Sequence, residues 1–379
     1  MITLSLFLCL FYTALVAAAL WHWRALPVWE LPQRFRPRTS ISVLIPARNE
    51  AANIAACVET ILQQNYPSEL YEIIVIDDHS TDATATIVQG LQHAYPQLRL
   101  LHLSDFINNE PLKAYKKKAL EVGIAQARGE LIVTTDADCM AQPDWLQLLA
   151  SFYEIQQARC IAAPVNFHQE TKLLERFQSL DFAGTMLLTG AGIRARFMRL
   201  ANGANLAYPK AVFEEVNGFA GIDHLASGDD MLLVQKIAAR YPADVHYLKN
   251  AAATVFTYAR PNWRSFLQQR IRWATKSSAY REWQITLMLA GVFCFCCNIV
   301  LCAVLSPFWR AAAVALGLQL AVKMFFDYLL LGSACRFFHR KDLMRHFLPA
   351  QVLHILYIVV LGFAANLVKQ YDWKGRRVQ

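Results

Sequence analysis

Charged residues are scarce in this chain: Asp, Glu, Lys and Arg make up 17% of its 379 residues, while 55% are hydrophobic. So few charges are unusual for a soluble protein. The apolar excess lies mainly at the two ends of the chain, which indicates membrane segments rather than an oversized core. Acidic residues are fewer than basic ones, and the formal net charge is +8. No basic stretch is interleaved with stacking aromatics, so we expect membrane contacts and an anionic ligand, not nucleic acid.

Paired cysteine motifs are also missing. The nine cysteines stand singly or inside apolar runs, as at Cys294, Cys296 and Cys297, and the chain has no two separated CxxC motifs. This excludes the usual zinc-ligand spacing and a disulfide framework. The cysteines are predicted to be small buried side chains of a protein in a reducing compartment.

The N-terminal segment lacks the marks of a cleaved signal peptide, namely a basic start and a small-residue cleavage pattern. Residues 1–23 are apolar almost throughout, which suits a membrane-spanning helix. Residues 24–39 form a linker with four arginines, which should be cytoplasmic by the positive-inside rule. We therefore predict an integral protein of the bacterial cytoplasmic membrane, with the following domain in the cytoplasm.

Residues 131–138 carry the most informative pattern in the chain. An apolar run rich in β-branched residues predicts a buried strand, and Asp136 and Asp138 follow it. Two acids at i and i+2 point to the same side, so both can reach one hard cation, whose open positions usually take phosphate oxygens. Asp-x-Asp also occurs by chance in solvated turns, and this alternative stays open here.

Further strands alternate with helices around this pattern. Strands are predicted over residues 40–46, 72–77 and 98–103, and helices over 51–64 and 113–127. This alternation predicts an α/β domain with a parallel sheet. Because Asp77 and Asp78 end the second strand, acids from two strands should meet at one edge of the sheet, as in a site for a nucleotide diphosphate.

Three segments resemble the opening motifs of family 2 glycosyltransferases, which have the Rossmann-like GT-A fold: residues 42–50, 75–82 and 135–138. The resemblance implies a nucleotide-sugar donor, UDP-linked, with Asp78 bonded to the uracil ring. It implies Mg²⁺ or Mn²⁺ on the diphosphate, held by Asp136 and Asp138. The residues implied to line the base and ribose are Pro46, Arg48 and Glu50.

A dense group of lysines begins the predicted helix 113–127. Lys116 matches the lysine of the family's Gly-Lys segment near the nucleotide, although the glycine is absent. The alternative is that the group, with Lys113, Lys117 and Lys118, is simply the solvated start of a helix.

Two later segments resemble the acceptor side of the same family. The small, amide-rich run from Asn202 to Tyr208 suits close approach of the backbone to a ligand. Asp229 and Asp230 precede an apolar-periodic helix, where acids are also ordinary partners of the helix dipole. In the family, Asp230 takes the place of the catalytic base, beside Asp229. The residues implied to contact the acceptor are Asn202, Gly203, Ala204 and Asn205.

Gln269, Arg272 and Trp273 match the Gln-x-x-Arg-Trp motif of the membrane-embedded branch that includes cellulose, chitin and hyaluronan synthases. Arg272 can neutralise a diphosphate leaving group. Trp273 can present a flat face to a sugar. The resemblance assigns Gln269 and Trp273 to the nucleotide sugar, and Trp273 to the acceptor as well. Residues 261–283 should form an amphipathic helix in the membrane interface. An interfacial anchor without chemistry is the alternative.

The remaining chain predicts two or three membrane helices within residues 284–369, followed by a basic tail over 370–379. Lys323 and Asp327 lie at i and i+4 inside one span, as part of a lipid-acceptor path or as a self-paired structural bridge. Pro349 makes the last segment a candidate for a broken or re-entrant helix. The side of the membrane on which the tail lies stays open.

The sequence thus predicts a cytosolic GT-A domain over residues 40–260 between membrane helices. The expected reaction is inverting transfer of a sugar from a UDP-sugar to a lipid-linked or saccharide acceptor. A processive polysaccharide synthase and a non-catalytic subunit that binds nucleotide sugars are the alternatives. A nucleotidyltransferase ranks last, because its Gly-rich loop is missing. The donor sugar and acceptor are left open.

Overall fold

The computed structural model describes residues 1–107, 112–225, 227–274, 283–367, 371–373 and 376–378. Its chain divides into two compact units. The first unit contains Met1–Leu26, Phe167–Met198 and Ala259–Tyr371. The second contains Pro27–Asn166, Arg199–Tyr258 and Asp372–Gln379.

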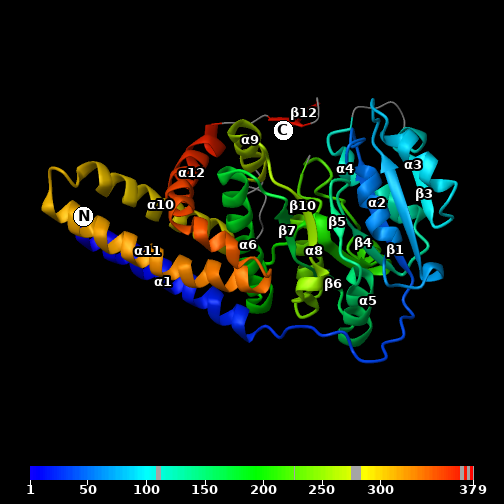
Figure 1. The fold of residues 1–379 in the computed structure, drawn as a ribbon, viewed down its shortest axis with the longest axis horizontal. Coiled ribbons are helices and arrows are strands. Elements are labelled where there is room, and N and C mark those ends of the chain that lie inside the picture. Colours follow the sequence, from blue (N-terminus) through cyan, green and yellow to red (C-terminus); the bar gives the residue numbers. More distant parts are fainter. Residues whose placement is uncertain (108–111, 226, 275–282, 368–370, 374–375, 379) are drawn as a thin grey trace. The chain divides into compact units, whose positions relative to one another are not determined.

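A seven-stranded sheet of order β3-β2-β1-β4-β8-β6-β9 forms the core of the second unit (Figure 1). Its strands are β1 Ile41–Ala47, β2 Tyr71–Asp77, β3 Leu98–His102, β4 Leu131–Thr134, β6 Cys160–Ala162, β8 Leu206–Pro209 and β9 Val245–Tyr247. Strands β1 and β4 are buried almost throughout, as expected of β-branched runs covered on both faces. The four strands β3, β2, β1 and β4 are parallel, as predicted.

Strand β8 departs from the predicted parallel order, because it runs antiparallel to β4. Leu206, its first residue, pairs with Thr134, the last residue of β4. Residues 202–205 therefore enter the sheet at the edge where β4 ends. This local reversal brings the amide-rich segment and the acids after β4 to the same edge.

Helices flank this sheet. They are α2 Ile54–Leu62, α3 Thr84–Gln92, α4 Tyr115–Gln126, α5 Trp145–Gln156, α7 Lys210–Glu215 and α8 Met231–Arg240. Helix α2 is shorter than the predicted 51–64, and a turn precedes it in which the Glu50 carbonyl accepts from the amides of Asn53 and Ile54. Helix α4 packs on β1 and β2. A small sheet of order β5-β10-β7 adds β5 Met140–Ala141, β10 Val255–Tyr258 and β7 Val165–His168.

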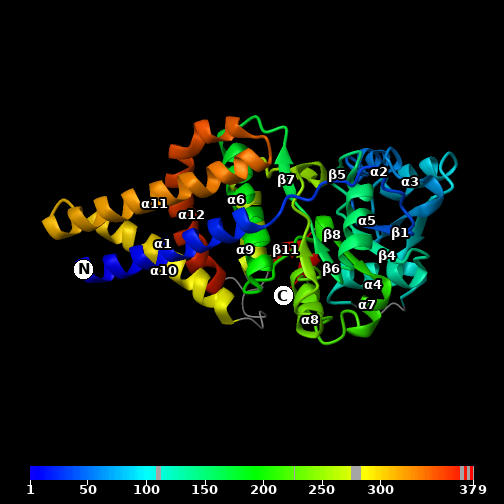
Figure 2. The ribbon, with the colours of Figure 1, turned by 90° about the horizontal axis from the view of Figure 1, so that it is seen from below.

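The first unit is a bundle of helices (Figures 1 and 2). They are α1 Ile2–Ala25, α6 Leu173–Ala195, α9 Trp263–Ala274, α10 Trp283–Leu305, α11 Arg310–Phe337 and α12 Phe347–Leu367. Helix α1 packs against α6, α10 and α11. Residues 167–198, which the predicted domain 40–260 includes, belong to this bundle because α6 also contacts α11 and α12.

Four helices in the described chain are long and apolar enough to cross a membrane: Ile2–Ala25, Trp283–Leu305, Arg310–Phe337 and Lys341–Ala364. Helix α12 is continuous through Pro349, not broken as the sequence suggested. Pro349 lies in the first helical turn, where backbone N–H groups lack intrahelical partners and proline is tolerated. In the tail, β11 Tyr371–Trp373 pairs with β12 Arg376–Val378. Part of the predicted helix 261–283 falls outside the described residues.

The charged pair inside the bundle is closed on itself. Lys323 Nζ lies 2.6 Å from Asp327 Oδ2, one helical turn away on α11. The Tyr12 hydroxyl of α1 donates a hydrogen bond to the other carboxylate oxygen of Asp327. Lys323 is 1% exposed. These contacts favour the structural bridge over a lipid-acceptor path.

Candidate active site

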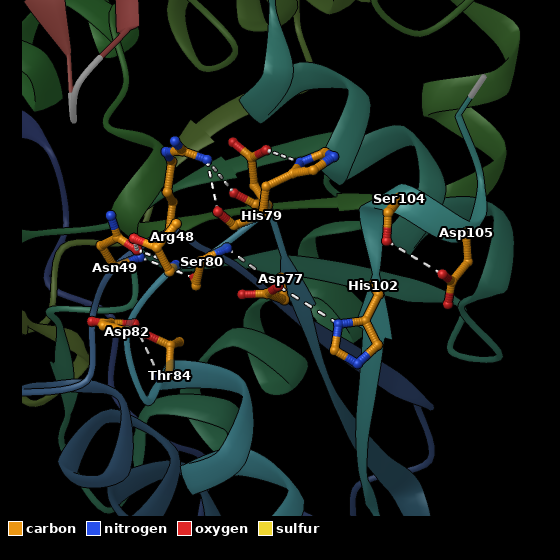
Figure 3. A network of polar contacts seen from close by, with 12 residues as sticks. Arg48, Asn49, Asp77, His79, Ser80, Asp82, Thr84, His102, Ser104 and Asp105 are labelled. Atoms are coloured by element: carbon orange, nitrogen blue, oxygen red, sulfur yellow. Dashed lines mark hydrogen bonds and ion pairs between the residues drawn. The ribbon is translucent and has the colours of Figure 1, made fainter. Parts of the chain in front are cut away.

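The loops after β1 and β2 are tied to each other at the carboxyl ends of these strands (Figure 3). Arg48 Nη1 donates to the carbonyl oxygens of Asp78, at 2.8 Å, and of His79, at 3.0 Å. The Asp78 amide donates to the Ala47 carbonyl at 2.8 Å. The structure therefore brings Arg48 and Asp78 together at the predicted nucleotide end of the site.

Side chains of the second loop hold the first one in place. The Ser80 hydroxyl accepts from the Asn49 amide at 3.0 Å, and Asp82 Oδ2 accepts from the Ala51 amide at 3.0 Å. Asp82 also accepts from the amide of Thr84, the first residue of α3, at 3.0 Å. The two loops are thus bonded to each other at several points.

The acids at the end of β2 are buried. Asp78 is 3% exposed, and its Oδ1 lies 3.0 Å from His79 Nδ1. Asp77 Oδ2 lies 3.6 Å from His102 Nδ1, while its Oδ1 is buried without a hydrogen-bond partner among the described residues. Glu50 Oε2 accepts from Asn53 Nδ2 at 2.9 Å. Pro46 is half-buried within β1.

The two acids after β4 form a small cluster that suits a hard cation. Ligand atoms of Asp136, Asp138 and Cys139 all lie within 4.8 Å of one another. Burial, with the neighbouring carboxylates, holds the pKa of the Cys139 thiol well above its usual range. Cys139 is also buried, with 2% of its surface exposed. The two half-exposed carboxylates remain as the oxygen ligands that Mg²⁺ or Mn²⁺ prefers.

Lys116, at the start of α4, joins this acid cluster to the Gly-Asp-Asp segment. Its Nζ lies 2.8 Å from Asp136 Oδ1 and 3.0 Å from Asp229 Oδ2. Burial works to lower the pKa of Lys116, but the carboxylates of Asp136 and Asp229 outweigh it and raise the pKa. Lys116 is therefore a permanent cation between two motifs, not the solvated helix start that the sequence left open.

Gly203 links the amide-rich segment to Asp230. The Gly203 amide donates to Asp230 Oδ2 at 3.2 Å, and the Met231 amide donates to Asp230 Oδ1 at 2.7 Å. Thr134, the last residue of β4, donates from its hydroxyl to the Gly203 carbonyl at 2.7 Å. A Cβ at position 203 would lie 3.2 Å from Asp229 Oδ2, so glycine permits this close approach.

The side chain of the neighbouring Asn205 is hydrogen-bonded to other parts of the fold. Its buried side chain accepts from Trp145 Nε1 at 2.9 Å and donates to the carbonyls of Pro164, at 2.7 Å, and Ala253, at 2.8 Å. Asn202 bonds locally, accepting from the amide of the buried Ala204 at 2.9 Å. Of the predicted acceptor residues, Gly203 thus lies beside the acids, while the side chains of Asn202 and Asn205 fix the local turn.

The Gln-x-x-Arg-Trp motif lies on α9, in the first unit. Between its named positions, sequence reasoning missed Arg270, whose Nη2 lies 2.8 Å from Asp181 Oδ2 of α6. The Arg270 guanidinium also lies 4.8 Å from the ring centre of Trp273 and 5.2 Å from that of Phe266. Arg270 is 5% exposed. Trp273 therefore packs on a buried cation, and the contacts of Gln269 and Arg272 with a donor stay predictions.

The parallel-rich sheet, with acids at its carboxyl edge, is a GT-A-like arrangement. It matches the mannosyltransferase PcManGT from Pyrobaculum calidifontis, solved in complex with GDP-Man and Mn²⁺. The match has a TM-score of 0.56 and 19% identity, and covers 97% of this chain and 99% of that one. At such low identity the match shows the fold.

Two family models match the sequence. The model of glycosyl transferase family 2 matches residues 42–213, and that of glycosyl transferase family group 2 matches residues 131–326. Because the second match spans more than half of the chain, the chain belongs to glycosyl transferase family group 2. The predicted membership of the glycosyltransferases is thereby confirmed at the level of the family.

Curated relatives match the chain in part. Glycosyltransferase AglE of Haloferax volcanii is 31% identical over 193 residues, which cover 50% of this chain and 59% of that protein. A beta-monoglucosyldiacylglycerol synthase of Synechocystis sp. is 27% identical over 161 residues, covering 41% of this chain and 33% of that protein. The chain spans less than two thirds of the length of either relative.

Proposed function

We propose that the protein transfers a sugar from a UDP-sugar to a lipid-linked or saccharide acceptor hydroxyl, with inversion at the anomeric carbon. One observation carries the proposal: Lys116 bridges Asp136 to Asp229, and the adjacent Asp230 is bonded to Gly203. Four motifs that are remote in the sequence are thereby joined in one cluster at the end of the sheet.

Asp230 is the general base in this proposal. Its carboxylate accepts hydrogen bonds from two backbone amides, which fix its orientation. As the acceptor oxygen bonds to the anomeric carbon, its proton passes to Asp230 and the bond to the diphosphate breaks. Attack from the face opposite the leaving group turns an α-linked donor into a β-linked product.

Asp136 and Asp138 would hold Mg²⁺ or Mn²⁺. When bound, the cation would supply positive charge for the diphosphate leaving group. Lys116 adds a permanent positive charge at the same edge and keeps Asp229 in place. The nucleotide would bind where the ends of β1 and β2 are hydrogen-bonded to each other. The residues proposed to bind it there are Pro46, Arg48, Glu50 and Asp78.

The acceptor is proposed to be a lipid or a saccharide at a membrane surface. Four helices suited to crossing a membrane support this, as does the name of the beta-monoglucosyldiacylglycerol synthase. Gln269, Arg272 and Trp273 support assignment to the membrane-embedded branch with Arg272 as a diphosphate ligand. The arginine-rich linker supports a cytoplasmic site in a bacterial inner membrane.

Nucleotide release by the purified protein in detergent tests this proposal. We would supply a panel of UDP-, GDP- and dTDP-sugars with Mn²⁺ and a bacterial lipid extract, and measure the nucleoside diphosphate formed. Turnover of one UDP-sugar that depends on the extract is expected. Absence of turnover with every donor, by protein that still binds UDP and Mn²⁺, would instead favour a non-catalytic subunit.

A further inference from the structure

Lys117, next to Lys116, is a buried lysine with no role in the mechanism above. Its side chain is 2% exposed. Its Nζ donates to three backbone carbonyl oxygens, those of Ile222 at 2.6 Å, Leu225 at 2.7 Å and Ser227 at 2.9 Å. The sequence alternative of a solvated helix start fails for this residue too.

The three carbonyls belong to the segment that leads into Gly-Asp-Asp. Ser227 is followed by Gly228, whose φ of +85° is a left-handed conformation, and then by Asp229 and Asp230. An ammonium group has three N–H donors, and three carbonyl oxygens of this segment accept from it. A buried charge is costly unless hydrogen bonds satisfy it, so these bonds hold both the lysine and the segment in place.

We propose that Lys117 is a positioning residue, which sets the place of Asp229 and Asp230 by clamping the carbonyls of the segment before them. Two successive lysines of α4 then position the same acids in different ways. Lys116 bonds the Asp229 carboxylate from the side of the acid cluster, while Lys117 fixes the backbone that carries it. This inference rests on the proposed function for its kinetic consequence, but the clamp itself is tested without it.

A second lysine supplies a matched control. Lys236 of α8 donates to the carbonyls of Gly218, at 2.5 Å, and Ala220, at 2.9 Å, at the other end of the same connection. Lys236 is therefore a comparable clamp, and the carbonyls that it binds lie farther along the chain from the acids than those that Lys117 binds. Lys118 of α4, paired with Glu121 at 3.3 Å and 40% exposed, is a surface control.

The experiment compares Lys117→Met, Lys236→Met and Lys118→Met in full-length protein. Amide exchange is measured over residues 213–221 and 222–232. UDP binding with Mn²⁺ is measured by calorimetry, and kcat is measured with the donor found in the panel.

For Lys117→Met we expect faster exchange over 222–232 and a kcat about 10- to 100-fold lower, because small misplacement of a base is costly. UDP affinity should change less than about twofold, since the nucleotide loops are untouched. Lys236→Met should speed exchange over 213–221 and leave kcat within about threefold, and Lys118→Met should change neither.

Unchanged exchange over 222–232 in Lys117→Met would overturn the clamp, whatever the turnover. Faster exchange with unchanged kcat would overturn the positioning role. If wild-type protein turns over no nucleotide sugar, the proposed function fails, and the exchange data alone judge the clamp. Should Lys117→Met not fold, Lys117→Gln takes its place, because its side chain keeps two N–H donors. Its amide exchange over 222–232 should be faster than in wild type but slower than in an unprotected loop. Wild-type exchange in Lys117→Gln would then contradict the clamp.

Discussion

Two lysine–aspartate pairs, one in each unit, have similar distances but different surroundings. Lys116 Nζ is 2.8 Å from Asp136, and the two side chains are 24% and 38% exposed. Lys323 Nζ is 2.6 Å from Asp327, and those side chains are 1% and 9% exposed. The first pair also reaches the acid Asp229, while the second lies within one turn of α11 and has the Tyr12 hydroxyl of α1 as a further partner. A charge pair that is open and shared can take up a ligand; one that is buried and local satisfies itself.

The largest effect is expected at the acid cluster. Asp138→Asn should abolish turnover, because the proposed cation supplies several kcal/mol of charge stabilisation to the leaving group. EDTA should do the same to wild-type protein, and added Mn²⁺ or Mg²⁺ should restore activity. Nucleoside diphosphate release is the measurement. Full activity in metal-free buffer would remove the cation from the proposal.

Asp230→Asn should have the second-largest effect. Its kcat should be lower by about two to four decades, because the general base is lost. The amide side chain has a similar size but can accept from only one of the two backbone amides that bond Asp230. UDP binding with Mn²⁺ should remain, because the proposed cation ligands and nucleotide loops are unchanged. Steady-state kinetics and calorimetry check the two halves of this prediction. A variant with wild-type kcat would show that another group takes the acceptor proton.

Lys116→Met tests the open pair. Removing its positive charge leaves the carboxylates of Asp136 and Asp229 close together, and we expect kcat/KM to fall about 10- to 100-fold, or about 1.4 to 2.8 kcal/mol. Circular dichroism should show an unchanged fold. Activity equal to that of wild type would reduce this pair to a surface contact.

Lys323→Met tests the closed pair, and its effect on kcat per folded molecule should be the smallest. The variant leaves Asp327 buried without its cation, which should cost about 3 to 5 kcal/mol of stability. Replacing both residues, as Lys323→Met with Asp327→Leu, should recover most of it. Thermal unfolding in detergent checks the stability of both variants. Loss of kcat with unchanged stability would revive the lipid-acceptor path.

The sequence was a good guide wherever a pattern was local. The strand before Asp136 and Asp138, the apolar spans and the motif positions follow from periodicity and residue type within short windows. The roles of residues with remote partners were not predicted. In the sequence, Lys117 is one of several lysines expected at the surface, and Arg270 occupies an unspecified position of the Gln-x-x-Arg-Trp motif. Asn205 reads as a ligand residue but bonds Trp145 and two distant carbonyls. The antiparallel pairing of β8, the strand that follows Asn205, also depends on the tertiary fold.

Binding of Mn²⁺ in the presence of UDP, followed by electron paramagnetic resonance, tests the central claim most directly. The claim is that Asp136, Asp138 and Asp230 serve one ligand, with the first two holding the cation and the third acting as base. Wild type and Asp230→Asn should each bind one Mn²⁺ with equal affinity, only wild type being active, while Asp138→Asn should lose the signal of bound metal. Equal Mn²⁺ binding by all three proteins, or loss of binding in Asp230→Asn alone, would contradict the account.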